Sequence, residues 1–142
     1  MAAIIDTLCE AVVIDLNTQT WPAQFKAEFS DQPTFELAEN AGWTVTVVPA
    51  SEAASRHSRA TWQFDLAIDI GVMRRPVETF NKRAECRFLV EEIADWFRDN
   101  ALTRNPEHKA VVVVTDPIWD PVHLKELLQF SSIVQLTFRS WR

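Results

Sequence analysis

The segment TDPIWDPVHL, residues 115–124, holds the densest group of possible metal ligands in the chain. Asp116, Asp120 and His123 supply two carboxylates and an imidazole, which bind divalent cations when they converge. Asp-Pro pairs also begin turns and helices, with the aspartate as a helix N-cap. We interpret the segment as a turn and a helix start, and we predict no metal and no cofactor.

Other catalytic signatures are absent from the sequence. His57, His108 and His123 lie far apart, with neither a histidine pair four residues apart nor a Cys-x-x-Cys motif. The two glycines, Gly42 and Gly71, cannot form a nucleophile elbow or a phosphate-binding loop. A Ser-His-Asp triad assembled by the fold stays open, but no local pattern favours it. We therefore predict that the protein is not an enzyme.

Two carboxylates, Asp65 and Asp69, share the polar face of one predicted strand. Paired carboxylates serve acid–base catalysis when their environments separate their pKa values. A solvated sheet face is the alternative, and Gln63 on the same face favours it.

The composition bounds the class of protein. A chain of 142 residues, 47% of them hydrophobic, suits one domain with a single core, spanning residues 1–142. A formal charge of −6 disfavours general attraction to nucleic acid, so we interpret the scattered basic pairs as solvated charges. The expected partner is therefore protein.

Cysteine usage and the first residues indicate the compartment. Cys9 and Cys86 lie in apolar helical patterns, which predicts reduced thiols in the core. The segment MAAIIDTLCEAVVIDL lacks basic residues and carries acids in its apolar stretch, unlike a signal peptide or a membrane span. We expect a soluble intracellular protein without membrane contact.

Helical spacing of apolar residues predicts three helices. The first lies at the N-terminus and ends before Asn17. The main helix follows Pro76 and runs from about Val77 to about Asn100. A short helix is predicted over residues 120–128, with Asp120 as its N-cap.

Alternating and continuous apolar runs predict the strands. Residues 43–47, 62–72 and 134–138 alternate, Pro49 ends or bends the first strand, and residues 21–37 contain weaker extended pieces. The apolar run 111–114 is predicted to be buried on both faces. These elements indicate an α+β fold with a mixed, mainly antiparallel sheet, packed against one long helix and an N-terminal helix, with a long hairpin arm.

The polar segment 50–60 separates two of the predicted strands. It has no glycine, proline or large apolar residue, so it resembles neither a flexible linker nor a self-folding unit. A mobile loop and a partner contact both fit it, since arginines bind carboxylates in a bidentate manner. The candidate subunit or partner interface consists of Ser51, Glu52, Ser55, Arg56, His57 and Arg59.

Three runs together resemble tail terminator proteins of long-tailed bacteriophages and prophages. These runs are EAASRHSRATWQFDLAIDIGVMRR, FLVEEIADWFR and VVTDPIWDPVHLKELLQFSSIVQLTFR. The likeness covers about residues 45–139 in matching order, from a strand and a Ser/Arg-rich arm to the C-terminal strand ending Leu-Thr-Phe-Arg.

The resemblance implies a structural virion protein at the head-proximal end of the tail. Such proteins form a ring, typically of six subunits, that caps the tail tube, stops its polymerisation and meets the head-tail connector or neck protein. Asp65 and Asp69 are then expected to face the ring lumen, where negative charge lets DNA pass without binding. A neck or head-completion protein is the first alternative, and a small metal-dependent enzyme using Asp116, Asp120 and His123 is the second.

Overall fold

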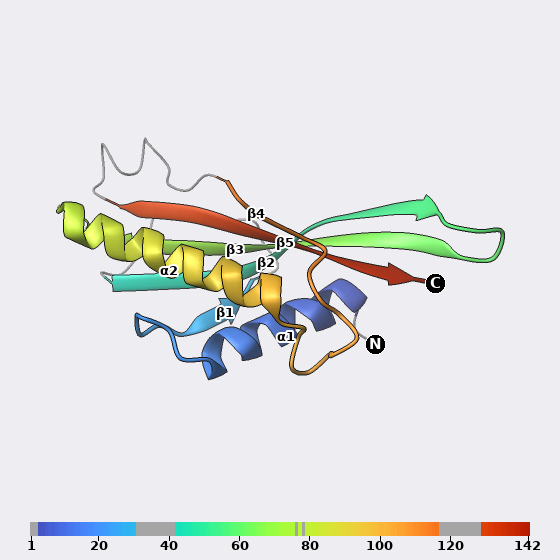
Figure 1. Cartoon of the computed structure of the whole chain (residues 1–142), viewed down its shortest axis with the longest axis horizontal. Coiled ribbons are helices and arrows are strands. Elements are labelled where there is room, and N and C mark those ends of the chain that lie inside the picture. The colour runs from blue at the N-terminus through green and yellow to red at the C-terminus, as the bar shows by residue number, and fades with distance from the viewer. Residues whose placement is uncertain (1–2, 31–41, 76, 78, 117–128) are drawn as a thin grey trace.

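The computed structural model describes residues 3–30, 42–75, 77, 79–116 and 129–142, which form a two-layer α+β structure (Figure 1). One layer is a five-stranded mixed sheet, and the other consists of two helices on one face of it. The predicted α+β class with a mixed, mainly antiparallel sheet is therefore confirmed. In chain order the elements are α1 (Ile4–Thr18), β1 (Ala27–Phe29), β2 (Gly42–Arg56), β3 (Trp62–Arg75), α2 (Phe80–Asp99), β4 (Val112–Thr115) and β5 (Phe130–Trp141).

The sheet has the strand order β1-β2-β3-β5-β4, and only the β1–β2 pair is parallel. β3 lies at its centre and pairs with β2 on one side and with β5 on the other along nearly its whole length. This position explains the strict alternation of its sequence, because one face of a central antiparallel strand meets the core and the other does not.

The core lies between the sheet and both helices. β3 points Leu66, Ile68, Ile70 and Val72 towards the helices, and all four are fully buried. α1 and α2 contribute their apolar stripes to this same cluster, including Leu8 and Phe97. Covering one sheet face with two amphipathic helices removes these side chains from water, which is the main favourable term in folding.

Helix α2 begins later than the sequence predicted. Its N-cap is Thr79, whose side-chain oxygen accepts a hydrogen bond from the backbone N–H of Lys82 at 3.2 Å. The prediction placed the start near Val77 because proline favours the first helical position. A threonine that satisfies an unpaired N–H of the first turn sets the start here instead.

Strand β4 contradicts one prediction. The run 111–114 was expected to be buried on both faces, yet Val112 and Val114 expose 47% and 45% of their surface. β4 is the last strand of the sheet order, and its outward side chains lie on the face away from both helices. Branched apolar residues therefore indicated a strand here but did not indicate its burial.

Strand β2 also runs further than predicted. It continues past Pro49 to Arg56, with a register irregularity between Pro49 and Ser51. Proline lacks the N–H that a central strand needs, but within the described residues β1 pairs with β2 only as far as Val47. Pro49 therefore bends β2 without ending it, and most of the predicted insert is strand.

Three smaller predictions have different outcomes. α1 includes Asn17 and ends at Thr18, whose hydroxyl donates to the carbonyl oxygen of Ile14 at 2.8 Å. β1 lies within the weak extended region, and β5 is longer at both ends than the predicted 134–138. The short helix predicted over residues 120–128 lies outside the described residues.

Both cysteines are buried and free, as predicted. Burial raises the pKa of the Cys9 thiol to about 12, with Asp6 and Glu10 adding to the shift. Burial also raises the pKa of Cys86, to about 11, although the charge of Arg74 opposes this. Both thiols are therefore protonated and unreactive at neutral pH.

Candidate interaction surface

The sheet extends beyond the two helices at one end, where the β2–β3 hairpin and the end of β5 lie together (Figure 1). We call this part the distal sheet, and it comprises residues 51–64 and 140–142. Trp62 occupies its middle strand, pairing with Arg56 of β2 and exchanging two backbone hydrogen bonds with Arg142. Every residue from 51 to 60 is exposed. The segment is thus held by backbone pairing rather than by burial of its side chains.

Arginine–aromatic pairs occupy the helix-side face of the distal sheet. The Arg56 guanidinium lies 4.7 Å from the ring centre of Trp62, and the Arg142 guanidinium lies 4.1 Å from that of Phe64. Arg142 also donates to the Glu52 carboxylate at 3.1 Å. Stacking of this kind is favourable because a cation is attracted to the electron-rich face of the ring.

The opposite face of the distal sheet carries a second aromatic group. The His57 ring lies 6.2 Å from the ring of Trp141 in an edge-to-face arrangement. Trp141 exposes 54% of its surface and Trp62 exposes 40%, so each face presents an incompletely covered indole. Exposed aromatic side chains grouped with arginines are typical of protein-binding surfaces.

The connection between β2 and β3 is short and hydrogen bonded. The backbone N–H groups of His57 and Ser58 both donate to the carbonyl oxygen of Thr61 at 3.0 Å. The Arg56 side chain donates to the carbonyl oxygen of Arg59 at 2.9 Å. These bonds fix the turn, so the arginine side chains project from an ordered backbone.

The six predicted interface residues therefore share one surface but differ in their surroundings. Glu52, Arg56 and His57 already contact Arg142, Trp62 and Trp141 respectively. The remaining three residues have no side-chain hydrogen bond, ion pair or ring contact within the part of the chain that the structure describes, and they are Ser51, Ser55 and Arg59.

The two predicted lumen residues lie on the sheet face away from the helices. Asp65 accepts a hydrogen bond from Arg139 at 2.9 Å, and Asp69 accepts one from Gln135 at the same distance. The hydrogen bond to Asp65 raises the pKa of Arg139. The carboxylates therefore differ, because Arg139 offsets the charge of Asp65 whereas Gln135 leaves the charge of Asp69 uncompensated.

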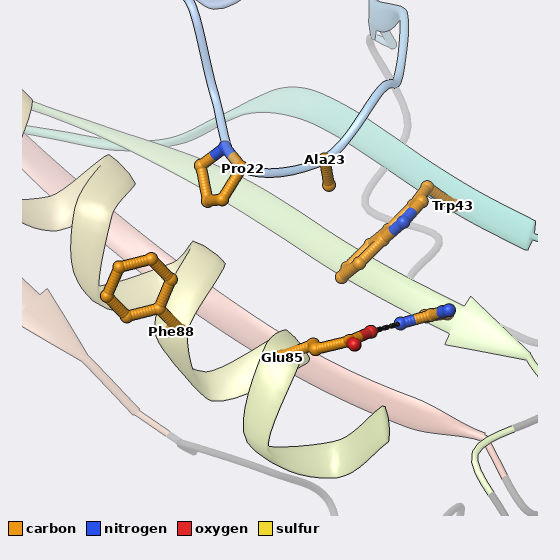
Figure 2. A pocket seen from close by; sticks show the side chains of 6 residues that line it. Pro22, Ala23, Trp43, Glu85 and Phe88 are labelled. Atoms are coloured by element: carbon orange, nitrogen blue, oxygen red, sulfur yellow. Dashed lines mark hydrogen bonds and ion pairs between the residues drawn. The ribbon is translucent and has the colours of Figure 1, made fainter. Parts of the chain in front are cut away.

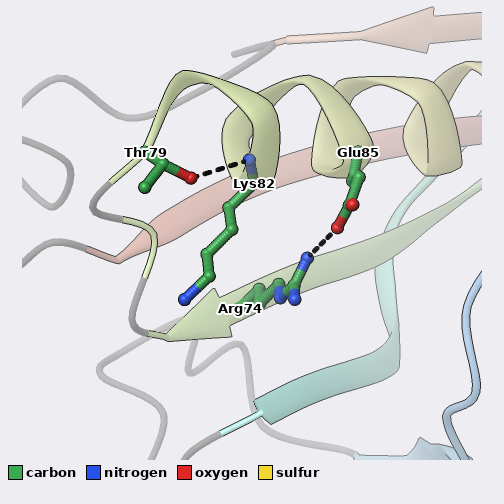
Figure 3. Close-up of polar contacts among 4 residues, drawn as sticks. All are labelled: Arg74, Thr79, Lys82 and Glu85. Atoms are coloured by element: carbon green, nitrogen blue, oxygen red, sulfur yellow. Dashed lines mark hydrogen bonds and ion pairs between the residues drawn. The ribbon is translucent and has the colours of Figure 1, made fainter.

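A separate pocket of about 250 Å³ lies between the segment after α1 and the start of α2 (Figure 2). Its walls include Pro22, Trp43 and Phe88, and Arg74 lies beside the Trp43 ring at 4.9 Å. Arg74 donates to Glu85 of α2 at 2.8 Å, which ties β3 to the helix and raises the pKa of Arg74 (Figure 3). The arginine is occupied by these contacts, so we interpret the cluster as a structural clamp.

Only one of the three candidate metal ligands lies within the described residues. Asp116 is exposed directly after β4, while Asp120 and His123 lie outside the described residues. Over residues 3–30, 42–75, 77, 79–116 and 129–142, no three histidine, cysteine or acidic side chains gather at one point.

The exposure of Trp62 was not predicted from the sequence. Trp62 was assigned to the same half-buried face as Phe64 and Leu66, because alternation does not reveal where the helical cover ends. The register supplies the signal that was missing, since it sets Arg56 directly opposite Trp62 across the hairpin.

Neither described helix is long and apolar enough to cross a membrane. Comparison with models of known protein families finds no match, and a search of curated proteins finds no significant match either.

Proposed function

We propose that the chain is a structural subunit that assembles with copies of itself into a closed ring, as tail terminator proteins of long-tailed phages do. The observation that carries this proposal is the distal sheet, which exposes both faces and holds Trp62 and Trp141 on opposite sides. A short sheet without a covering layer buries little apolar surface on its own. Contact with another chain supplies the missing cover.

The position of this surface supports a ring. The distal sheet is at one end of an elongated subunit, beyond both helices (Figure 1). Contact between such an end and a different surface of the next copy is heterologous, and heterologous contacts form a ring when the rotation closes. A cap that must stop a tube from growing needs closure of this kind.

The resemblance of residues 45–139 to tail terminators supplies the partners and the location. On this proposal the ring sits at the head-proximal end of the tail, between the tail tube protein and the connector or neck protein. It has no catalytic role, and DNA passes through its lumen. Asp69 is the better candidate for a lumen charge, because Asp65 is paired with Arg139.

The test measures native mass first and tube capping second. Native mass spectrometry should give a species close to six times the chain mass of 16.3 kDa, and negative-stain images should show a central hole. Added to polymerising tail tube protein, the ring should shorten the tubes and appear at one end of each. Binding to filled heads without any effect on tubes would contradict the terminator role and support the neck-protein alternative.

A further inference from the structure

The distal sheet is positively charged within an acidic protein. Residues 51–64 and 140–142 contain the cations Arg56, Arg59 and Arg142 against the single carboxylate of Glu52, whereas the whole chain has a formal charge of −6. Arg56 and Arg142 lie over aromatic rings, and Arg59 has no side-chain partner in the described part of the chain. A complementary partner surface is therefore acidic and has room for an aromatic side chain.

The second half of α2 has this chemistry. Glu91, Glu92 and Asp99 are exposed and have no side-chain partner in the described part of the chain, while Asp95 pairs with Arg98. This half of the helix therefore presents a net negative surface to solvent.

The charges along α2 are unevenly distributed. Acidic side chains stabilise a helix near its N-terminus and basic ones near its C-terminus. Here the first turn carries Lys82 and Arg83 and no acid, the last turn carries Arg98, and Glu91 and Glu92 lie near the middle of the helix. The helix dipole acts within the first and last turns, so it gives no reason for or against Glu91 and Glu92. These two exposed carboxylates are available to a basic partner surface.

A hollow of about 390 Å³ adjoins the acidic side chains, between α2 and β4. Val90 and Ala94 give it apolar walls, and the carboxylates of Glu91 and Asp95 are among its lining groups. Two arginines also line it, Arg98 paired with Asp95 and Arg87 lying over Phe80. The hollow thus offers apolar walls to an indole, and Glu91 is a lining carboxylate without a side-chain partner in the described part of the chain.

We propose that the distal sheet of one copy docks on the second half of α2 in the next copy, with Trp62 over the hollow and Arg59 against Glu91 and Glu92. This inference rests on the proposed ring assembly and names the two surfaces that meet in it. The two surfaces differ, so the contact is heterologous. Every open assembly keeps one unoccupied distal sheet and one unoccupied α2 surface until the ring closes.

Charge reversal tests the pairing. Arg59→Glu and the double variant Glu91→Lys/Glu92→Lys should each raise the dissociation constant for self-association at least about 10-fold, because like charges then face each other across the contact. An equimolar mixture of the two variants should restore assembly. In an alternating ring every reversed distal sheet meets a reversed helix and every native sheet meets a native helix. Alternation requires an even number of subunits, which a ring of six satisfies.

Arg104→Glu is the matched control, because Arg104 is an exposed arginine outside both surfaces. It should leave the dissociation constant unchanged. Far-ultraviolet circular dichroism and thermal melting of each variant separate a lost contact from a lost fold. All the substituted positions are exposed, so each variant should melt within a few degrees of the native chain.

The outcomes distinguish the docking from the ring. If the native chain forms a ring and neither charge reversal raises the dissociation constant for self-association, the docking is contradicted but the ring is not. A mixture of the two variants that fails to restore assembly also contradicts the docking alone. A native chain that stays monomeric at every concentration overturns the ring and the docking together. Arg59-dependent binding of a labelled single-stranded thymidine oligonucleotide by such a monomer would assign the distal sheet to nucleic acid instead.

Discussion

The two ends of β3 share one alternating pattern but have different surroundings. At Leu66, Ile68 and Ile70 the helix-side residues are fully buried beneath α1 and α2, whereas at Trp62 the corresponding position exposes 40% of its surface. We call the first part the covered sheet, meaning β3 from Leu66 to Val72 and its paired neighbours. Alternation therefore shows which face of a strand is apolar. Whether that face packs in the core or is free to bind another molecule depends on whether the helices cover it.

The largest expected effect on stability comes from truncating one aromatic side chain in each of the two parts and comparing the losses. Phe138→Ala in the covered sheet should lower the free energy of unfolding by about 3–5 kcal/mol, because it leaves a cavity beneath the helices. Phe64→Ala in the distal sheet should lower it by less than about half as much, since Phe64 is only partly buried. Urea unfolding followed by tryptophan fluorescence measures both. Equal losses would show that the distal sheet belongs to the folding core.

Alkaline pH should act through the helices that cover the sheet and not through the distal sheet. Cys9 and Cys86 have pKa values of about 12 and about 11 in the fold against 9.0 without it, and the distal sheet has no thiol. A raised pKa gives stability that is complete below the unfolded value and is lost as pH rises towards the folded value. Between pH 8 and pH 10 the free energy of unfolding should fall by about 1–3 kcal/mol.

The double variant Cys9→Ala/Cys86→Ala is the control for this pH dependence. It should be less stable than the native chain at pH 7, because each substitution removes a buried side chain. Its unfolding free energy should nevertheless change less between pH 8 and pH 10. An unchanged pH slope would assign the alkaline loss to other groups.

The smallest expected effect concerns order within the distal sheet. Arg56→Ala removes the stacking on Trp62 and the hydrogen bond to the Arg59 carbonyl oxygen, which together should change global stability by less than about 1 kcal/mol. Amide hydrogen exchange over residues 57–62 should accelerate, while exchange in the covered sheet stays unchanged. Arg56→Lys, which keeps the charge but loses the planar guanidinium, should behave like the alanine variant.

Much of the fold could be predicted from periodicity, because the helices and β3 each keep one apolar stripe against a single core. Two predictions were wrong because they used local sequence patterns without knowledge of the sheet order. Val112 and Val114 have the side chains of a buried strand, but β4 lies at one end of the sheet order with its outward face uncovered by α1 or α2. The strand predicted over residues 43–47 was too short, because pairing with β3 carries β2 past Pro49.

The candidate surface was only partly predictable. Composition singled out residues 50–60 as unusual, and the arginines followed from residue type. The contacts of Arg142 with Phe64 and Glu52 join residues 78 and 90 positions apart, so no local pattern could reveal them. The hollow beside α2 likewise depends on packing between the helix and β4.

Hydroxyl-radical footprinting of Trp62, read by mass spectrometry across a concentration series, tests most directly whether the distal sheet is covered by another copy. The account predicts that oxidation of Trp62 falls as the assembled fraction rises, while Phe29, exposed in β1 and outside both proposed surfaces, stays equally reactive. Unchanged oxidation of Trp62 in a sample that light scattering shows to be fully assembled would contradict it.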